Sequence, residues 1–95
     1  MSYLPASVSI VRPQKLLQRL ARGSVSNISF EDMCALVQAF GFELRRVSGS
    51  HHIFVHPDVT ELVNLQEVDG QAKPYQIRQV LRLVERYYLT LEAEA

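Results

Sequence analysis

Hydrophobic residues recur at helical spacing in three segments of this chain, and an alternating, β-prone region lies between the second and the third. The first segment predicts a short helix from Gln14 to about Ala21, with Pro13 in its first turn. Its apolar face is made of three leucines: Leu16, Leu17 and Leu20. Residues 22–28 carry Gly, Ser and Asn without periodicity and are expected to form a connecting loop.

The second segment predicts a helix that begins after Ser29. Serine is a favoured N-cap residue, and the acidic side chains of Glu31 and Asp32 suit the positive end of a helix dipole. The apolar stripe consists of Phe30, Met33, Cys34, Val37 and Phe40. Gly41 is expected to end the helix, because glycine adopts the left-handed conformation at this position without strain.

The region that follows predicts three antiparallel strands. They are expected at residues 42–47, 51–56 and 61–66, with turns at Ser48-Gly49 and Pro57-Asp58. Residues 67–73 contain Asp69-Gly70 and are expected to be a loop. A last helix opens at Pro74, and its apolar face carries Ile77, Val80, Leu81, Val84 and Tyr88.

This order of elements predicts an α+β fold, in which a three-stranded antiparallel sheet carries helices on one face. That is the economical way to bury both apolar stripes, and the short first helix is an accessory to it. The chain therefore divides into an N-terminal extension with a helix and a loop, residues 1–28, a domain over residues 29–91, and an acidic tail, residues 92–95.

Composition fits one globular domain without special stabilisation. Of the 95 residues, 47% are hydrophobic and 21% are charged. The single cysteine, Cys34, excludes an internal disulfide and is expected to be a buried, inert thiol. Residues 1–11 do not resemble a secretory signal, and no apolar run is long enough to span a membrane. A reducing cytoplasm is the expected location.

The formal net charge is zero, which by itself argues against strong nonspecific attraction to nucleic acid. The distribution is uneven, however. Residues 72–88 contain four basic side chains and only one acidic side chain, Glu85. The basic residues of this stretch are Lys73, Arg78, Arg82 and Arg86.

Two adjacent histidines follow the turn Gly49-Ser50 at the rim of the predicted sheet. An imidazole titrates near pH 6.5 and can both accept and return a proton at cellular pH. Strand alternation puts His51 on one face and His52 on the other, together with His56. His52 and His56 would be about 13 Å apart, too far to ligate one ion, so no metal and no cofactor are expected.

Three segments in order, Gly49-Ser50-His51-His52, Asn64-Leu65-Gln66 and 72–76 (Ala-Lys-Pro-Tyr-Gln), resemble the HicA family, the small RNA-cleaving toxins of toxin–antitoxin pairs. The resemblance covers roughly residues 29–88. It implies the fold of double-stranded-RNA-binding domains, α-β-β-β-α. It also implies an endoribonuclease that cleaves messenger RNA and is neutralised by a HicB-like antitoxin.

By the same resemblance, the first histidine after Gly-Ser, His51, would be the catalytic base acting on a ribose 2′-hydroxyl or on a water. Contacts to RNA or its phosphates are expected from Lys73, Gln76, Arg45, Arg46 and Ser50. Supporting roles are expected from His52, Asn64 and Gln66, whose two amides would either orient the imidazole or satisfy the strand end. The general acid stays open: either His51 acts alone, or His52 or His56 supplies the proton.

Two other functions fit the residues. The chain can be a non-catalytic RNA-binding module that holds RNA by shape and local positive charge. Alternatively, it can be a protein-interaction domain without RNA contact, as the zero net charge allows. In either of these cases His51 would merely cap the turn or hydrogen-bond within the sheet.

Overall fold

Three helices and one antiparallel sheet form the part of the chain that the computed structural model describes, residues 12–92. The elements are α1 (Pro13–Ala21), α2 (Phe30–Ala39), β1 (Glu43–Ser48), β2 (His51–His56), β3 (Val59–Val68), β4 (Gln71–Ala72) and α3 (Pro74–Arg86). The predicted α-β-β-β-α order with a helix in front is confirmed. Residues 1–11 of the predicted extension and 93–95 of the predicted tail lie outside the described part.

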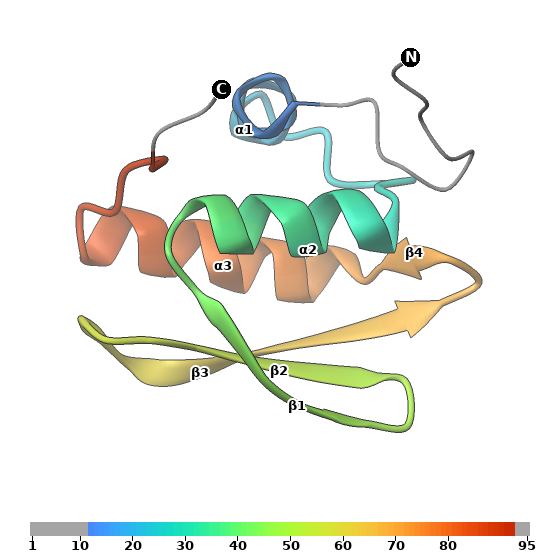
Figure 1. Cartoon of the computed structure of the whole chain (residues 1–95). Coiled ribbons are helices and arrows are strands. Elements are labelled where there is room, and N and C mark those ends of the chain that lie inside the picture. Colours follow the sequence, from blue (N-terminus) through green and yellow to red (C-terminus); the bar gives the residue numbers. More distant parts are fainter. Residues whose placement is uncertain (1–11, 93–95) are drawn as a thin grey trace, which may run out of the picture.

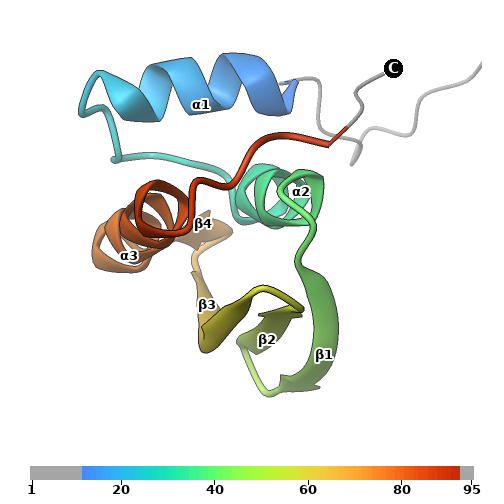
Figure 2. The same ribbon diagram turned by 90° about the vertical axis from the view of Figure 1, so that its left-hand side faces the viewer.

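The elements form layers. Figures 1 and 2 show α2 and α3 beside each other on one side of the sheet, and α1 across them on the side away from the sheet. The strands follow one another in the order β1-β2-β3-β4. No described helix covers the opposite side of the sheet, which we call the outer face. Within residues 12–92, no helix combines the length and the apolar character needed to cross a membrane.

The ends of α2 follow the chemistry of its flanking residues. The Ser29 hydroxyl accepts a hydrogen bond from the backbone N–H of Asp32 at 3.2 Å, as expected for an N-cap. At the other end Gly41 has φ of 97°, and its N–H bonds to the carbonyl of Gln38. The N–H of Phe42 bonds to the carbonyl of Val37, which completes a Schellman motif.

Gly41→Ala is expected to lower the free energy of unfolding by about 2–3 kcal/mol, because a positive φ is costly for alanine and the space is filled. A Cβ atom there would lie 2.6 Å from Glu92 Oε2 and 3.0 Å from His56 Nε2. Urea titration followed by circular dichroism measures the change. Gly23→Ala is the matched control, since Gly23 has φ of 91° but nothing within 4 Å. An equal cost at both positions would contradict the steric argument.

The sheet has a fourth strand, so the prediction of a three-stranded sheet with a loop over residues 67–73 was wrong in this part. β3 extends to Val68, the turn consists of Asp69 and Gly70, and β4 pairs back onto β3. Both turn residues have positive φ, 52° and 77°, which is the requirement of a type I′ hairpin. The backbone of β4 also bonds to the segment before α2, through Ala72 N–H and the carbonyl of Ile28.

The pairing of β1 with β2 is interrupted by a bulge at Arg45. Leu44 pairs with Phe54, whereas the next paired residue, Arg46, is opposite Ile53. The extra residue shifts the alternation of β1, so that Arg46 shares the outer face with Ile53. A strictly alternating strand would have put Arg45 there, and the sequence pattern gives no sign of the shift.

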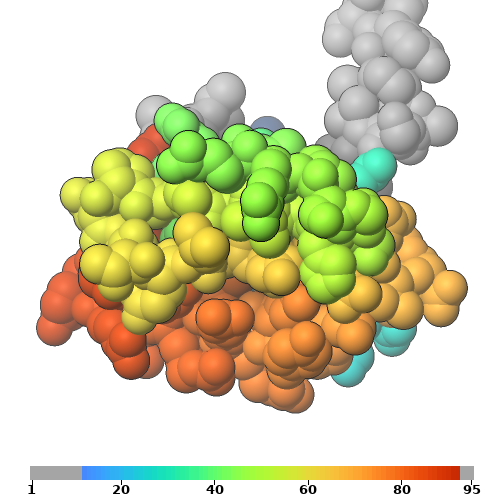
Figure 3. All heavy atoms as spheres, turned by 90° about the horizontal axis from the view of Figure 1, so that it is seen from below, coloured from blue at the N-terminus to red at the C-terminus, as the bar shows by residue number. Residues whose placement is uncertain are grey.

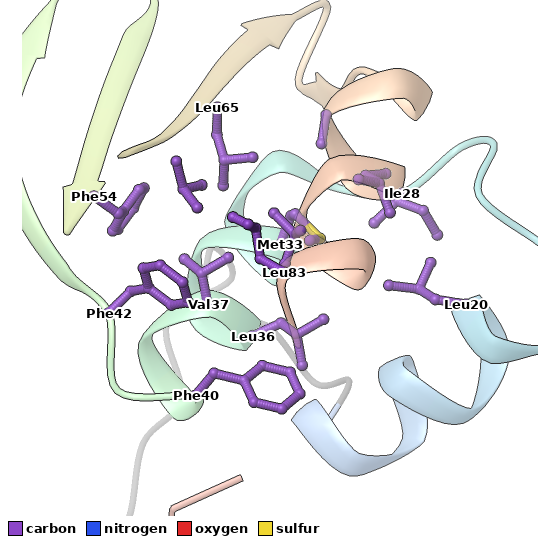
Figure 4. Close-up of a cluster of buried hydrophobic side chains, with 14 of the residues drawn as sticks. Leu20, Ile28, Met33, Leu36, Val37, Phe40, Phe42, Phe54, Leu65 and Leu83 are labelled. Carbon is purple, nitrogen blue, oxygen red and sulfur yellow. The ribbon is translucent and has the colours of Figure 1, made fainter. Parts of the chain in front are cut away.

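The core lies between the sheet and the helices and continues upward to α1. Leu16 and Leu20 of α1 are each 2% exposed and belong to the same cluster as Leu36 and Phe54. Figure 4 shows Leu20 directed toward Ile28 and the α2 side chains. The predicted packing of the first helix through its leucines is therefore confirmed, with Leu17 partly buried.

Two sequence expectations about the core need correction. Cys34 is only partly buried, although burial raises the pKa of its thiol to about 11, so the group stays protonated at neutral pH. Tyr88 does not extend the apolar face of α3. It follows the end of the helix with φ of 55° and is 89% exposed.

Candidate active site

His51 is the first residue of β2 and lies on the outer face of the sheet. Side chains alternate along a strand, and Phe54, three residues later, is 1% exposed in the core. His52 therefore faces the helices with Phe54, while His51 and Ile53 face away from them. The imidazole of His51 is partly exposed, as a group that meets a substrate must be.

Asn64 holds the imidazole of His51 in one orientation. His51 Nδ1 is 3.1 Å from Asn64 Oδ1, and Asn64 comes from the neighbouring strand β3. An amide oxygen only accepts hydrogen bonds, so Nδ1 carries the proton in this contact. The neutral ring then has its lone pair on Nε2, which is the arrangement of a general base.

The turn before His51 is joined to β3 by two hydrogen bonds, both of which Ser50 accepts. The Gln66 amide donates to Ser50 Oγ at 3.4 Å, and the N–H of Glu67 donates to the carbonyl of Ser50 at 3.0 Å. Gln66 is also the direct pairing partner of His51 in the sheet. Of the two predicted amides, Asn64 thus orients the imidazole and Gln66 fixes the turn.

Gln76 fastens α3 to β3 in the same region. Its side chain is buried, and Oε1 accepts the backbone N–H of Gln66 at 2.8 Å. The contact satisfies a strand N–H that is directed toward the helix rather than toward another strand. The amide is thereby engaged within the fold, and its predicted contact to phosphate stays a prediction.

Cationic side chains lie around this part of the sheet. Arg45 and Arg46 are exposed on the edge strand β1, and Arg46 shares the outer face with His51, two pairs along the strands from it. Lys73 precedes α3 directly, and its Nζ lies 5.8 Å from the centroid of the Tyr75 ring. The paired positions next to His51 on the outer face carry no carboxylate: they are Arg46, Ser48, Ile53, Asn64 and Gln66.

The arginines of α3 are not equivalent. Arg78 and Arg82 are exposed, whereas Arg86 forms an ion pair with Glu61 at 2.7 Å. Tyr87 also donates its hydroxyl to Glu61 at 2.6 Å, and this hydrogen bond is the main cause that lowers the pKa of the Glu61 carboxyl. No local pattern predicts this group, because Glu61 is 25 and 26 residues away from its two partners.

The other two histidines lie on the helix side of the sheet, away from His51. The ring of His52 packs edge-on against Phe30 at 4.8 Å, and its Nδ1 is buried with no hydrogen-bond partner among the described residues. His52 thus shares a strand with His51 but not a face. A general acid acting beside His51 cannot come from it in this geometry.

His56 is engaged at both ring nitrogens. Its Nε2 is 3.1 Å from the carbonyl of Phe40, and its Nδ1 accepts the N–H of Asp58 at 3.0 Å. Its ring lines a cavity of about 310 Å³ at the opposite end of β2 from His51. In residues 12–92, no group of three His, Cys, Asp or Glu side chains is arranged to hold a metal ion.

Comparison with known proteins agrees with the resemblance in the sequence. Residues 30–85 match the model of a family described as "HicA toxin of bacterial toxin-antitoxin". A search of curated proteins and a search of solved structures each gave no match. The matched segment runs from the start of α2 to the last turn of α3 and includes His51, Asn64 and Lys73. Because the match covers more than half of the chain, this protein belongs to the HicA family of bacterial toxins.

Proposed function

We propose that this toxin is an endoribonuclease that cleaves messenger RNA, with His51 as its general base. The observation that carries the proposal is the contact between His51 Nδ1 and Asn64 on the outer face. It leaves Nε2 with a lone pair, on a partly exposed ring that has no carboxylate at the paired positions beside it. The family match supports a toxin as the setting for this chemistry.

The reaction needs one proton transfer to start. His51 Nε2 takes the proton of a ribose 2′-hydroxyl, and the oxygen attacks the adjacent phosphorus. The bond from phosphorus to the 5′ oxygen of the next nucleotide breaks, and that oxygen takes up a proton from the imidazolium or from water. The products are a 2′,3′-cyclic phosphate and a 5′-hydroxyl. If a water attacked instead, a 2′-deoxy substitution at the cleaved position would leave the rate unchanged.

Positive charge on the same side of the molecule supports phosphate binding. Arg46 lies on the outer face, Arg45 is adjacent on the bulge, and Ser50 is in the turn before His51. Lys73 stands at the start of α3, where helix amides add a favourable field for an anion. These groups would hold the phosphate and stabilise the charge that grows on its oxygens. Gln76 would contribute by keeping the start of α3 against β3.

The proposed mechanism uses no metal ion. The imidazole that the Asn64 amide orients is itself the base. The step therefore needs no carboxylates that bind a metal ion. The partner that neutralises the toxin would be a HicB-like antitoxin, and it would act by covering the outer face around His51. RNA would then lose access to both the imidazole and Arg46.

A direct experiment tests the proposal. Purified toxin is incubated with a labelled messenger RNA in the presence of EDTA, and the fragments are separated and their ends analysed. Cleavage that gives cyclic phosphate ends and stops on addition of the antitoxin supports the proposal. If the protein binds RNA but does not cleave it at any pH from about 5 to 8, it is a non-catalytic RNA-binding module instead. If the protein shows no RNA binding that weakens with added salt, the protein-interaction domain is the function that fits.

Asn64→Ala is expected to lower kcat about 10- to 100-fold with little change in KM, because the ring of His51 loses the acceptor that orients it. Initial rates on a short RNA substrate measure the two constants. Asn64→Asp is the matched variant, since it keeps an oxygen acceptor at the same place, and it should lower kcat less than Asn64→Ala does. Equal losses in both variants, or an effect confined to KM, would refute an orienting role.

A further inference from the structure

Tyr75 presents an aromatic ring to solvent in the first turn of α3. Its exposed fraction is 58%, although the two residues that follow it, Gln76 and Ile77, are 5% and 0% exposed. A tyrosine at a helix start often packs into its own domain, and here it does not. An exposed aromatic ring in a protein that handles nucleic acid is a surface on which a base can stack.

The Tyr75 ring is connected through one residue, Gln76, to the strand residue that pairs with His51. Gln76 Nε2 is 3.5 Å from the Tyr75 hydroxyl, and Gln76 Oε1 accepts the backbone N–H of Gln66 at 2.8 Å. Gln66 is in turn paired with His51. Figure 3, a view onto the outer face, shows α3 running next to β3 on the side that also carries the hairpin of β1 and β2. The ring is therefore linked to the strand pair that carries the imidazole through Gln76 and Gln66.

Lys73 adds a cation to the ring. Its Nζ is 5.8 Å from the Tyr75 centroid, within the range of a cation–π contact. A nucleotide combines a flat, apolar base with a negatively charged phosphate at a similar short separation. The pair Lys73 and Tyr75 offers a complement to each of these two parts.

We propose that Tyr75 stacks on an unpaired base next to the scissile phosphate while Lys73 contacts a neighbouring phosphate, so that the toxin acts on single-stranded RNA. Inside an RNA duplex both faces of a base are already covered by its neighbours, and a tyrosine ring can stack only on a base that has left the stack. The proposal rests on the function proposed above for the cleavage step, but the stacking itself is a binding event that can be measured separately.

Binding is measured with the His51→Ala form, which should hold RNA without cutting it, and a short fluorescein-labelled single strand of mixed sequence. Adding Tyr75→Ala is expected to weaken binding roughly 5- to 100-fold, whereas Tyr75→Phe keeps the ring and should bind nearly as well. Tyr88→Ala is the matched control, because Tyr88 is 89% exposed just past the other end of α3. The same sequence as a blunt duplex should bind more weakly than the single strand.

Strands with one abasic nucleotide separate stacking from a structural effect. At the position that contacts Tyr75, loss of the base should weaken binding to the ring-containing protein but hardly affect Tyr75→Ala. The proposal would be overturned if loss of a base weakened binding equally in both proteins at every position of the strand. Equal affinity for the single strand and the duplex would overturn it as well. The proposal would also be overturned if Tyr75→Ala bound RNA normally but lost affinity for the antitoxin. If the wild type does not cleave RNA at all, the proposed function fails, and the binding data still decide the role of Tyr75.

Discussion

His51→Ala is expected to reduce the rate of RNA cleavage by about 10²- to 10⁴-fold, the usual contribution of a positioned general base. No other imidazole among the described residues can take over, because His52 and His56 lie on the helix side of the sheet. Single-turnover cleavage of a short RNA measures the loss, and expression of both forms in bacteria reports it as restored growth. Folding should be unaffected, since the side chain contacts Asn64 on an exposed face.

His52→Ala is the control for this experiment. It removes the neighbouring histidine, which packs on Phe30 at 4.8 Å, and should lower stability while cleavage by the folded fraction persists. If His51→Ala cleaves as fast as the wild type, or if His52→Ala is the variant that loses chemistry, the assignment of the base is wrong.

Leu20→Ala is expected to lower the free energy of unfolding by about 2–5 kcal/mol, the range for truncating a buried leucine. Leu20 is 2% exposed, and it is part of the same hydrophobic cluster as residues of α2 and the sheet. The result matters because α1 lies outside the segment matched by the family model, residues 30–85. Urea denaturation monitored by circular dichroism measures the difference.

Gln18→Ala provides the comparison on the same helix. Gln18 is exposed, and such surface changes usually alter stability by less than about 0.5 kcal/mol. Both variants should cleave RNA normally at temperatures where they are folded. A cost for Leu20→Ala no larger than that for Gln18→Ala would mean that α1 adds little to the core.

Local patterns in the sequence were sufficient for most of the fold. The helices follow apolar periodicity and clear end signals, such as the Ser29 cap and Gly41, and the turn before His51 follows from Gly49-Ser50. The opposite faces of His51 and His52 follow from strand alternation alone. The catalytic role of His51 came from the family resemblance, and it remains a prediction until cleavage is measured.

The features that sequence reasoning missed depend on contacts between distant segments. β4 consists of two residues, too few for a periodic pattern, and Asp69-Gly70 is a turn signal that also occurs in loops. Gln76 looks like a surface residue in the sequence, but the unpaired N–H of Gln66 draws it into the interior. The bulge at Arg45 changes which arginine accompanies His51, and no local rule specifies that extra residue.

The zero net charge is compatible with RNA as a substrate because a sum over the chain does not describe its surface. The paired outer-face positions around His51 carry Arg46 and neutral side chains. By contrast, Asp58 and Glu92 line the cavity at the far end of β2. An RNA strand would meet the first region, and its affinity should fall as salt screens these few cations.

The division of the two adjacent histidines between opposite sides of β2 makes the length of the preceding turn a determinant of activity. Inserting one residue after Gly49 while the strand kept its pairing positions would rotate every following side chain by half a period. His52 would then occupy the solvent-facing place and His51 would be pressed against Phe30. In this hairpin only one of the two adjacent imidazoles is directed to solvent, and the length of the turn decides which of them it is.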